Sequence, residues 1–327
     1  MEHWILLVYQ VTGSCARWLT HKRARHSLSN LLSTRIANRL VAVGIENQSG
    51  SLKALLQSSK ILAVPGVFDG MTAWLAQKAG FEAIFLSGAA VSASQLACPD
   101  IGLTTLTELA STLERIRLRT NAAILVDADS GFGNAHNVRR TIRTLEHAGA
   151  SGIQLEDQVE TKDREQIMLR PLVSLEQMAD KIKAAQDAKL YTNTVISART
   201  DSFSSCGLAE SLDRTEAYLE AGADLIFVEG IKRKEELTEL CEKFKGRAPV
   251  ACNIMNNKEL SALKIDDLSQ MGISLVLYPL VPIEKSSNAA FEALLELAEI
   301  AQGGARVNPF GDRNIANLID SEAYLND

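Results

Sequence analysis

The stretch AILVDADSGFGNAHNVRRTIRTLEHAGASGIQLED, residues 123–157, decides the fold. It contains two short apolar runs, Ala123–Val126 and Gly152–Leu155, on either side of an amphipathic segment at 135–148 that ends at Gly149. Runs rich in Val, Ile, Leu and Ala, without polar alternation, are typical of strands buried on both faces of a parallel sheet. Glycine is the usual residue just past the end of a helix. The stretch therefore predicts a strand–helix–strand unit with parallel strands.

The same alternation continues on both sides of this unit. Six further apolar runs have the same composition: Ile61–Phe68, Ala83–Ser87, Thr194–Ala198, Leu225–Val228, Pro249–Cys252 and Leu275–Tyr278. Helical patterns accompany them at residues 70–79, 105–119, 175–188, 208–221, 234–245, 258–271 and 285–301. Eight strand–helix units in about 240 residues predict an α/β fold of the (β/α)8 or TIM barrel type. An open doubly wound sheet is the alternative, but VPGVFDGMTAW, after the first strand, lacks its G-x-G-x-x-G pattern.

The predicted barrel domain covers residues 47–301 and has a distinct segment at each end. Residues 47–58 predict a short helix that would plug the bottom of the barrel, and residues 302–327 form a polar tail. Residues 1–46 form a basic leader, with six Lys or Arg residues against two acids, in a chain of net charge −6. This composition suits an organellar transit peptide and hence a matrix location. A disordered N-terminus on a cytoplasmic protein is the alternative, and we favour it.

Composition excludes several classes of function. The net charge of −6 gives no sign of nucleic-acid binding, and no apolar run approaches the roughly 20 residues of a membrane span. The five cysteines form no C-x-x-C pair, which indicates reduced thiols in an intracellular compartment. The five histidines show no metal-ligand spacing, so zinc or triad chemistry is not expected.

Polar residues follow most of the predicted strands at the point where each strand ends. They are Ser87-Gly88, Asp127-Ala128-Asp129, Glu156-Asp157, Arg199-Thr200-Asp201, Glu229 and Asn253. In a barrel of parallel strands these ends meet at one rim, where TIM-barrel enzymes place their active sites. The sequence therefore predicts an active site at this rim.

Three of these acids predict a metal site. Asp127 and Asp129 are two residues apart and would point the same way on a strand, with Glu156 on the neighbouring strand. Carboxylates packed so closely repel one another unless a cation or a shared proton lies between them. Hard oxygen ligands without His or Cys favour Mg²⁺ or Mn²⁺. Acids that merely cap the following helices are the alternative, which we favour for a single acid but not for three.

Two other features predict an anion site. Arg199 presents a planar fork that accepts a carboxylate with two hydrogen bonds, although it also has Glu156 and Glu229 as candidate ion-pair partners. Residues Ser87–Ala89 predict a turn of small residues whose backbone N–H groups would cradle an oxyanion. A small anionic substrate is therefore the expected partner.

Six segments carry a resemblance: LSGAAVSASQLACPDIG, ILVDADSGFGNAHNVRRTI, AGASGIQLEDQV, ISARTDSF, AGADLIFVEG and LVLYPL. In this order, over roughly residues 50–300, they resemble the isocitrate lyase/phosphoenolpyruvate mutase superfamily, in its 2-methylisocitrate lyase-like branch. The resemblance implies a magnesium enzyme and a homotetramer in which the last barrel helix is exchanged between subunits. It also implies Asp100 and Lys162 as catalytic residues, with Arg199 and Glu229, and Phe85 and Asn253 as substrate-binding residues, with Ser87, Gly88 and Ala89.

One loop departs from the family pattern. The lyases carry K-(K/R)-C-G-H after the fourth strand, where the Cys protonates the leaving enolate. Here the loop reads EDQVETKDREQIMLRPLVS, in which Lys162 keeps the first Lys but Arg164 stands at the Cys position. An arginine stays protonated at all useful pH values and cannot act as acid and base in turn.

The residues therefore leave three functions open. The first is a Mg²⁺-dependent enzyme that cleaves a C–C bond in a small 2-oxo or 2-hydroxy di- or tricarboxylic acid, as a methylisocitrate-type lyase or an oxaloacetate-acting decarboxylase. The second is a phosphonate enzyme of the phosphoenolpyruvate mutase type. The third is a non-catalytic homologue that kept a metal and anion pocket. Fold alone does not choose between them.

Overall fold

The computed structural model describes residues 51–58, 60–159, 170–255 and 257–302. Eight parallel strands form one closed barrel in sequence order, and β1 pairs with both β2 and β8. The strands are β1 (Leu62–Val67), β2 (Ala83–Leu86), β3 (Ala123–Asp127), β4 (Gly152–Glu156), β5 (Val195–Thr200), β6 (Leu225–Val228), β7 (Val250–Asn253) and β8 (Ile273–Tyr278). The predicted TIM barrel is confirmed. Residues 1–46, Lys162 and Arg164 lie outside the described residues, as does the tail from residue 303.

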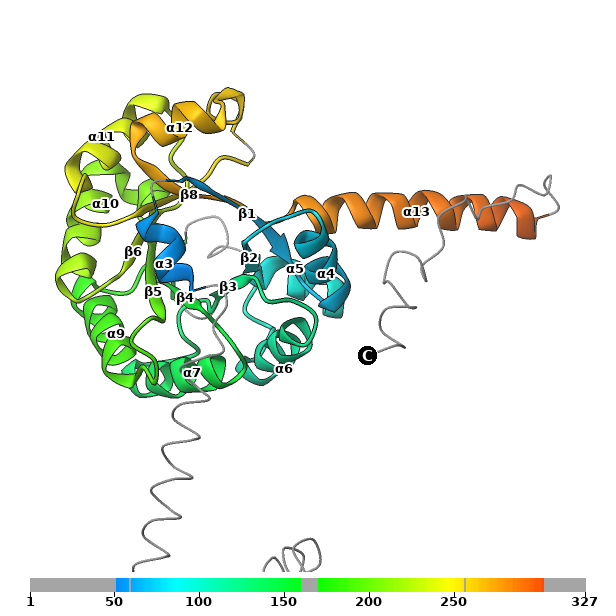
Figure 1. Ribbon diagram of the computed structural model, residues 1–327, viewed down its shortest axis with the longest axis horizontal. Helices are drawn as coiled ribbons and strands as arrows, with labels where there is room; N and C mark the ends of the chain where they lie inside the picture. Colours follow the sequence, from blue (N-terminus) through cyan, green and yellow to red (C-terminus); the bar gives the residue numbers. More distant parts are fainter. Residues whose placement is uncertain (1–50, 59, 160–169, 256, 303–327) are drawn as a thin grey trace, which may run out of the picture. The chain divides into compact units, whose positions relative to one another are not determined.

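The helices form a ring around these strands (Figure 1). They are α4 (Gly70–Lys78), α5 (Gly88–Leu96), α6 (Leu106–Arg117), α7 (Ala135–His147), α9 (Leu175–Ala188), α10 (Phe203–Glu220), α11 (Lys234–Phe244) and α12 (Ile265–Met271). Helix α13 (Val281–Ala301) follows β8. The pattern at 258–271 divides into a short 3-10 helix at Leu260–Ala262 and α12. Helix α10 begins earlier than predicted and is interrupted at Gly207, whose φ is 80°.

Helix α5 corrects the prediction of a turn after β2. Its sequence, GAAVSASQL, consists mainly of small residues and lacks the apolar spacing that marks an amphipathic helix. Ser87 is nevertheless its N-cap, because the Ser87 hydroxyl accepts a hydrogen bond from the Ala90 N–H. A helix N-terminus therefore lies at the barrel rim directly after β2.

Two apolar regions lie on opposite sides of the sheet. The larger one lies between the strands and the outer helices, and includes Ile153 and Leu155 of β4. The other fills the inside of the barrel, where helix α3 (Leu52–Gln57) contributes Leu52 and Leu56. Figure 1 shows α3 at the opening of the barrel. A Cβ atom at Gly152 would come within 2.6 Å of the Leu52 side chain, so the predicted plug is confirmed.

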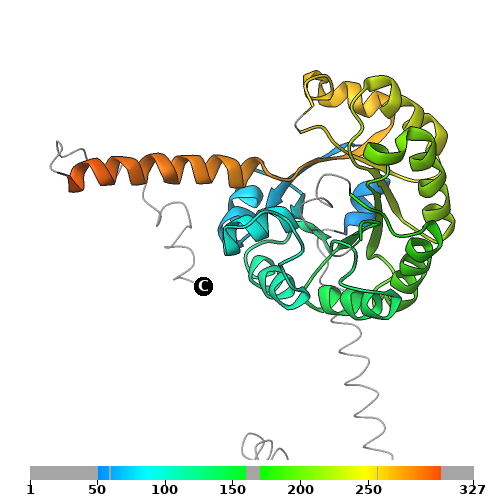
Figure 2. The ribbon, with the colours of Figure 1, turned by 180° about the vertical axis from the view of Figure 1, so that it is seen from behind.

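Helix α13 differs from the other helices in its packing. It starts against β1 and α5 but has no buried residue. Its apolar side chains are exposed, among them Phe291 at 63% and Leu294 at 62%. Figures 1 and 2 both show α13 reaching beyond the ring of helices. Among the described helices, none has both the length and the apolar character needed to cross a membrane.

Candidate active site at the carboxyl ends of the strands

The polar residues predicted for the rim lie at the carboxyl ends of consecutive strands. Asp127, Glu156 and Asn253 are the last residues of β3, β4 and β7. Ser87 and Glu229 directly follow β2 and β6. Because the strands are parallel and form one closed barrel, these residues share one end of it.

Arg199 is the centre of an ion-pair chain at this rim. Its Nε and Nη2 atoms donate to the two carboxylate oxygens of Asp201, each at 2.9 Å. Its Nη1 atom lies 3.2 Å from Oε2 of Glu156. The guanidinium also lies 5.7 Å from the centre of the Phe227 ring. The predicted pairing of Arg199 with Glu156 is present, whereas the contacts of Arg199 with Asp201 and Phe227 were not predicted from the sequence.

The surrounding charges keep Arg199 ionised although its side chain is only 15% exposed. Burial alone would lower the pKa of Arg199, but the negative charges of Asp201, Glu156 and Glu229 outweigh it and raise that pKa well above its usual value. Burial would likewise raise the pKa of Asp201, but Arg199 and Arg170 hold it below its usual value. Arg170 contacts Asp201 at 2.5 Å. The site therefore keeps a permanent positive charge among carboxylates.

A second buried acid, Asp157, fixes the backbone of the residues that form this ion-pair chain. Its carboxylate is fully buried and accepts hydrogen bonds from the Thr200 hydroxyl (2.7 Å) and the Asp201 N–H (3.0 Å). Arg214 (3.2 Å) and the Tyr218 hydroxyl (2.8 Å) donate from α10. Burial and the neighbouring Asp157 charge raise the pKa of Tyr218. Asp157 thus connects β4, the end of β5 and α10, and it holds Asp201 beside Arg199.

The start of α5, where an anion cradle was predicted, lies next to Asp127. The first amides of a helix have no carbonyl partner within the helix, and here they belong to Gly88 and Ala89. A Cβ atom at Gly88 would lie 3.4 Å from Oδ2 of Asp127. Glycine therefore allows the helix N-terminus to approach this carboxylate closely. Such an N-terminus favours a bound anion.

The structure modifies the predicted metal site. Strand β3 ends at Asp127, and Asp129 has a φ of 47°, so the strand alternation that would align the two side chains does not continue. Instead the Asp129 carbonyl accepts a hydrogen bond from the Glu156 N–H at 2.9 Å. Among the described residues, no group of three His, Cys, Asp or Glu side chains is placed to hold a metal ion.

A magnesium ion nevertheless fits this donor set. Mg²⁺ keeps several waters and is commonly bound through only one or two carboxylates together with substrate oxygens. Asp127, which is 7% exposed, and Glu156, which already faces the cation of Arg199, are the oxygen donors at this point of the rim. The predicted set of Asp127, Asp129 and Glu156 therefore stays a prediction, with Asp127 as its best-supported member.

The other predicted residues lie in different surroundings. Asp100 is half-buried in the loop between α5 and α6 and lines a cavity of about 420 Å³ together with Ala89. The Asn253 side-chain oxygen accepts a hydrogen bond from the Met255 N–H at 3.0 Å. Phe85 is 2% exposed and belongs to the apolar interior of the barrel. Phe85 therefore packs in the core of this structure, and its role in substrate binding stays a prediction.

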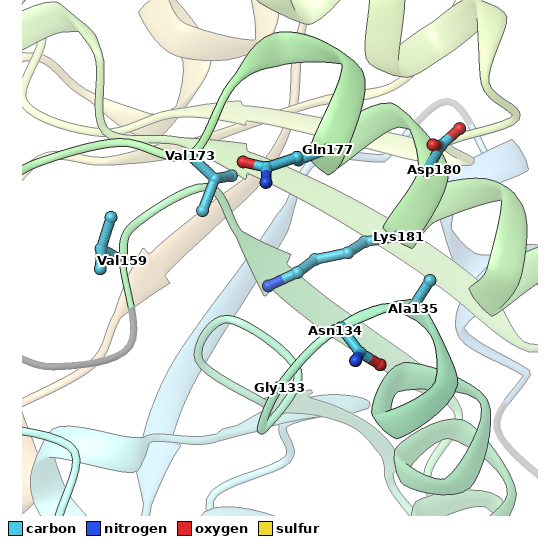
Figure 3. A pocket seen from close by; sticks show the side chains of 8 residues that line it. All are labelled: Gly133, Asn134, Ala135, Val159, Val173, Gln177, Asp180 and Lys181. Atoms are coloured by element: carbon cyan, nitrogen blue, oxygen red, sulfur yellow. The ribbon is translucent and has the colours of Figure 1, made fainter.

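A separate cavity of about 470 Å³ lies between the starts of α7 and α9 (Figure 3). It is lined by Gly133, Asn134, Ala135, Val159, Val173, Gln177, Asp180 and Lys181. The Lys181 ammonium donates to the Ser130 carbonyl at 2.9 Å and so ties α9 to the loop after β3. None of the predicted site residues lines this cavity, and the rim is the better candidate because the charged groups converge there.

Comparison with known proteins decides the family. The family model for phosphoenolpyruvate phosphomutase matches residues 52–299. The chain belongs to this family. A 2-methylisocitrate lyase from Aeropyrum pernix is 39% identical over 248 residues, which cover 76% of this chain and 79% of that protein. A 2,3-dimethylmalate lyase from Eubacterium barkeri is 38% identical over 243 residues, covering 74% of this chain and 83% of the relative.

Solved structures of the phosphoenolpyruvate phosphomutase family share the fold. A crystal structure of 2,3-dimethylmalate lyase, a member of the PEP mutase/isocitrate lyase superfamily, has a TM-score of 0.76 and 27% identity over 84% of this chain and 95% of its own. Phosphonopyruvate hydrolase in complex with oxalate and Mg²⁺ has a TM-score of 0.75 and 28% identity, and the match covers 84% of this chain and 96% of its own. The predicted superfamily is confirmed, and with it an enzyme of the carbon–carbon lyase type.

Proposed function

We propose that the protein is a Mg²⁺-dependent enzyme that cleaves a C–C bond in a small 2-oxo or 2-hydroxy di- or tricarboxylic acid through an enolate. The observation that supports it most is the cation of Arg199, whose side chain is 15% exposed and which Asp201 and Glu156 orient at the same rim that carries Asp127 and the start of α5. A largely desolvated, preorganised cation stabilises developing negative charge much better than one in water. The relatives named for methylisocitrate and dimethylmalate cleavage act on acids of this size and charge.

Each residue of the rim has a role in this proposal. Arg199 pairs with a substrate carboxylate and with the charge of the enolate, and the first amides of α5 bind a second anionic oxygen. Asp127 and Glu156 would hold Mg²⁺, which when bound supplies further positive charge to the enolate oxygen. Glu229 acts on the substrate indirectly, because its negative charge helps to keep Arg199 ionised.

The remaining predicted residues complete the site from its edges. Asp100 approaches from the loop after α5, and Asn253 contributes the polar wall at the end of β7. Lys162 keeps the position of the first Lys of the lyase loop and would act on the substrate through its charge. Asp129 supports the metal region through its backbone contact with Glu156.

No thiol takes part in this proposal. Cys241 and Cys252 are buried in the core between strands and outer helices, away from the barrel interior. Burial raises the pKa of Cys241 to about 12, and it raises the pKa of Cys252 as well. Arg164 occupies the aligned position of the lyase Cys. We therefore infer that solvent protonates the enolate, which suits decarboxylation of an oxaloacetate-like acid as well as lyase cleavage.

A phosphonate substrate is the second candidate. It is supported by the structural likeness to phosphonopyruvate hydrolase, which was solved with oxalate and Mg²⁺. A phosphonate would use the same cation and helix N-terminus, because both bind anionic oxygens without regard to the atom that carries them.

A panel assay separates these functions. Purified protein with Mg²⁺ is offered methylisocitrate, oxaloacetate, dimethylmalate and phosphonopyruvate, and pyruvate or the corresponding enolate product is followed. We expect turnover of one of the three carboxylic acids, and near-complete loss in the isosteric variant Asp127→Asn. Turnover of phosphonopyruvate alone would establish the second candidate. Tight binding of an acid without turnover would show a non-catalytic homologue.

We further propose that α13 packs on another copy of the chain in a homotetramer. Its exposed apolar side chains, which include Phe291, Leu294, Leu295 and Leu297, make a patch that a monomer would leave in water. Light scattering after size exclusion should show tetramers for the wild-type chain and smaller species for Leu294→Glu. A monomeric wild-type protein would contradict the proposal.

A further inference from the structure

Two polar side chains, Gln154 and Ser197, lie inside the barrel beneath the ion-pair chain of the rim. Successive residues of a strand face opposite sides of the sheet. On β4, Ile153 and Leu155 pack toward the outer helices, so Gly152, Gln154 and Glu156 face inward. The contact that a Cβ atom at Gly152 would make with Leu52 and Leu125 confirms that this face is the inside.

Gln154 and Ser197 are neighbours across the sheet. Gln154 of β4 is in register with Ser197 of β5, as Glu156 is with Arg199 two residues farther along. On its other side, Gln154 is in register with Asp127 of β3. Asp127, Gln154 and Ser197 therefore form one polar row across three adjacent strands.

Neither side chain has its hydrogen bonds satisfied by the described residues. Gln154 is 1% exposed and Ser197 is fully buried. Both polar atoms of the Gln154 amide and the Ser197 hydroxyl lack a hydrogen-bond partner there. Below them the interior is apolar, with Leu52, Leu125 and Val195. Since buried polar groups are nearly always hydrogen bonded, this row requires a small polar partner inside the barrel.

We propose that Gln154 and Ser197 form a binding site for ordered water on the inside of the barrel, and that this water donates a hydrogen bond to Asp127. A neutral amide and a hydroxyl each donate and accept, which matches water better than an ion of either sign. The carboxylate of Asp127 only accepts, so the bound water directs an O–H toward it. Gln154 and Ser197 are thus positioning residues for the proposed metal ligand, and this role rests on the proposed function.

Each of the two residues can be replaced by one that lacks its polar atoms. Gln154→Met keeps the length of the side chain and removes both polar atoms of the amide, and Ser197→Ala removes one oxygen. Thr194→Val is a matched control, because the buried Thr194 hydroxyl donates to the Glu146 carboxylate (2.5 Å) just before the start of β5, at the end of the barrel opposite to the rim. Circular dichroism and size exclusion establish that each variant is folded.

The first readout is a high-resolution crystal structure of the metal-free wild-type protein. We expect a water within hydrogen-bond distance, about 2.7–3.2 Å, of both the Gln154 amide and the Ser197 hydroxyl. The melting temperature gives an independent sign. If no water bound these polar groups, Gln154→Met would raise the melting temperature, because the substitution removes an uncompensated buried amide. A dry interior or a raised melting temperature would overturn the water site.

The second readout is Mg²⁺ affinity by calorimetry, which needs no turnover. Loss of a residue that orients a metal ligand typically weakens metal binding about 10- to 100-fold. We expect about a 10-fold loss for Gln154→Met and Ser197→Ala, and none for Thr194→Val. Unchanged affinity, or a wild-type protein that binds no Mg²⁺, would overturn the positioning role. Failure of every acid in the panel assay, with these readouts as expected, would refute the proposed reaction alone.

Discussion

Replacing Arg199 by methionine should destabilise the protein even without substrate. The substitution keeps an unbranched side chain but leaves Asp201 and Glu156, which are fully buried and 2% exposed, without their shared cation. Removing one partner of a buried ion pair costs about 3–5 kcal/mol, because a charge stays buried and uncompensated. Arg170 still contacts Asp201, so we expect a value near the lower limit, about 3 kcal/mol.

The pH dependence of this loss follows from Asp201. In the wild-type protein the cations hold the pKa of Asp201 below its usual value, so its stabilising contribution is present above about pH 4 and is lost as the pH falls. In Arg199→Met, burial dominates and raises the pKa of Asp201 above its unfolded value. The variant therefore loses most stability at neutral pH. The difference between its free energy of unfolding and that of the wild type shrinks as the pH falls toward 4.

Urea denaturation at pH 7 and at pH 4.5 measures both effects. Arg199→Lys is the control, because it keeps the charge but loses the two-pronged contact with Asp201, and it should lose less stability than Arg199→Met. A difference below about 1 kcal/mol between wild type and Arg199→Met at pH 7, the size of an exposed pair, would refute the reasoning. So would a difference that grows on acidification.

Three further results are expected. Tyr218→Phe removes one donor to the buried Asp157 carboxylate and should lower the free energy of unfolding by about 1–3 kcal/mol in the same assay. Alkylation of accessible thiols such as Cys206 and the half-buried Cys98 should leave turnover nearly intact, because no thiol has a role in the proposed reaction; loss that parallels modification would implicate a thiol. Deletion of residues 1–46 should leave the melting temperature of the barrel within about 2 °C, whereas a larger fall would show that the leader packs on it.

The fold was predictable because its signals are local. Apolar runs such as Ala123–Val126 and glycines such as Gly149 report burial and helix ends within a few residues. The plug that contains Leu52 was predictable for the same reason. An amphipathic segment ahead of the first strand can bury its apolar side at the open bottom of the barrel. The order of the strands then placed the polar rim residues at one end.

The details of the site depend on contacts between distant residues. Asp157 accepts hydrogen bonds from Arg214 and Tyr218, which are 57 and 61 residues away, and only the packing of α10 on the barrel brings them together. Asp129 was placed by strand alternation, but its left-handed backbone ends that alternation. Helix α5 was missed because its small residues give no apolar period.

Calorimetric titration with Mg²⁺ tests the central claim most directly. The protein is titrated free of nucleotide and buffer chelators, as wild type and as Asp127→Ala, with melting curves to show that the variant is folded. The account predicts that the wild-type protein binds Mg²⁺ and that Asp127→Ala abolishes the binding, because this carboxylate lies beside the start of α5, at the end of the barrel that also carries the Glu156–Arg199 pair. Equal binding by both proteins, or none by either, would contradict it.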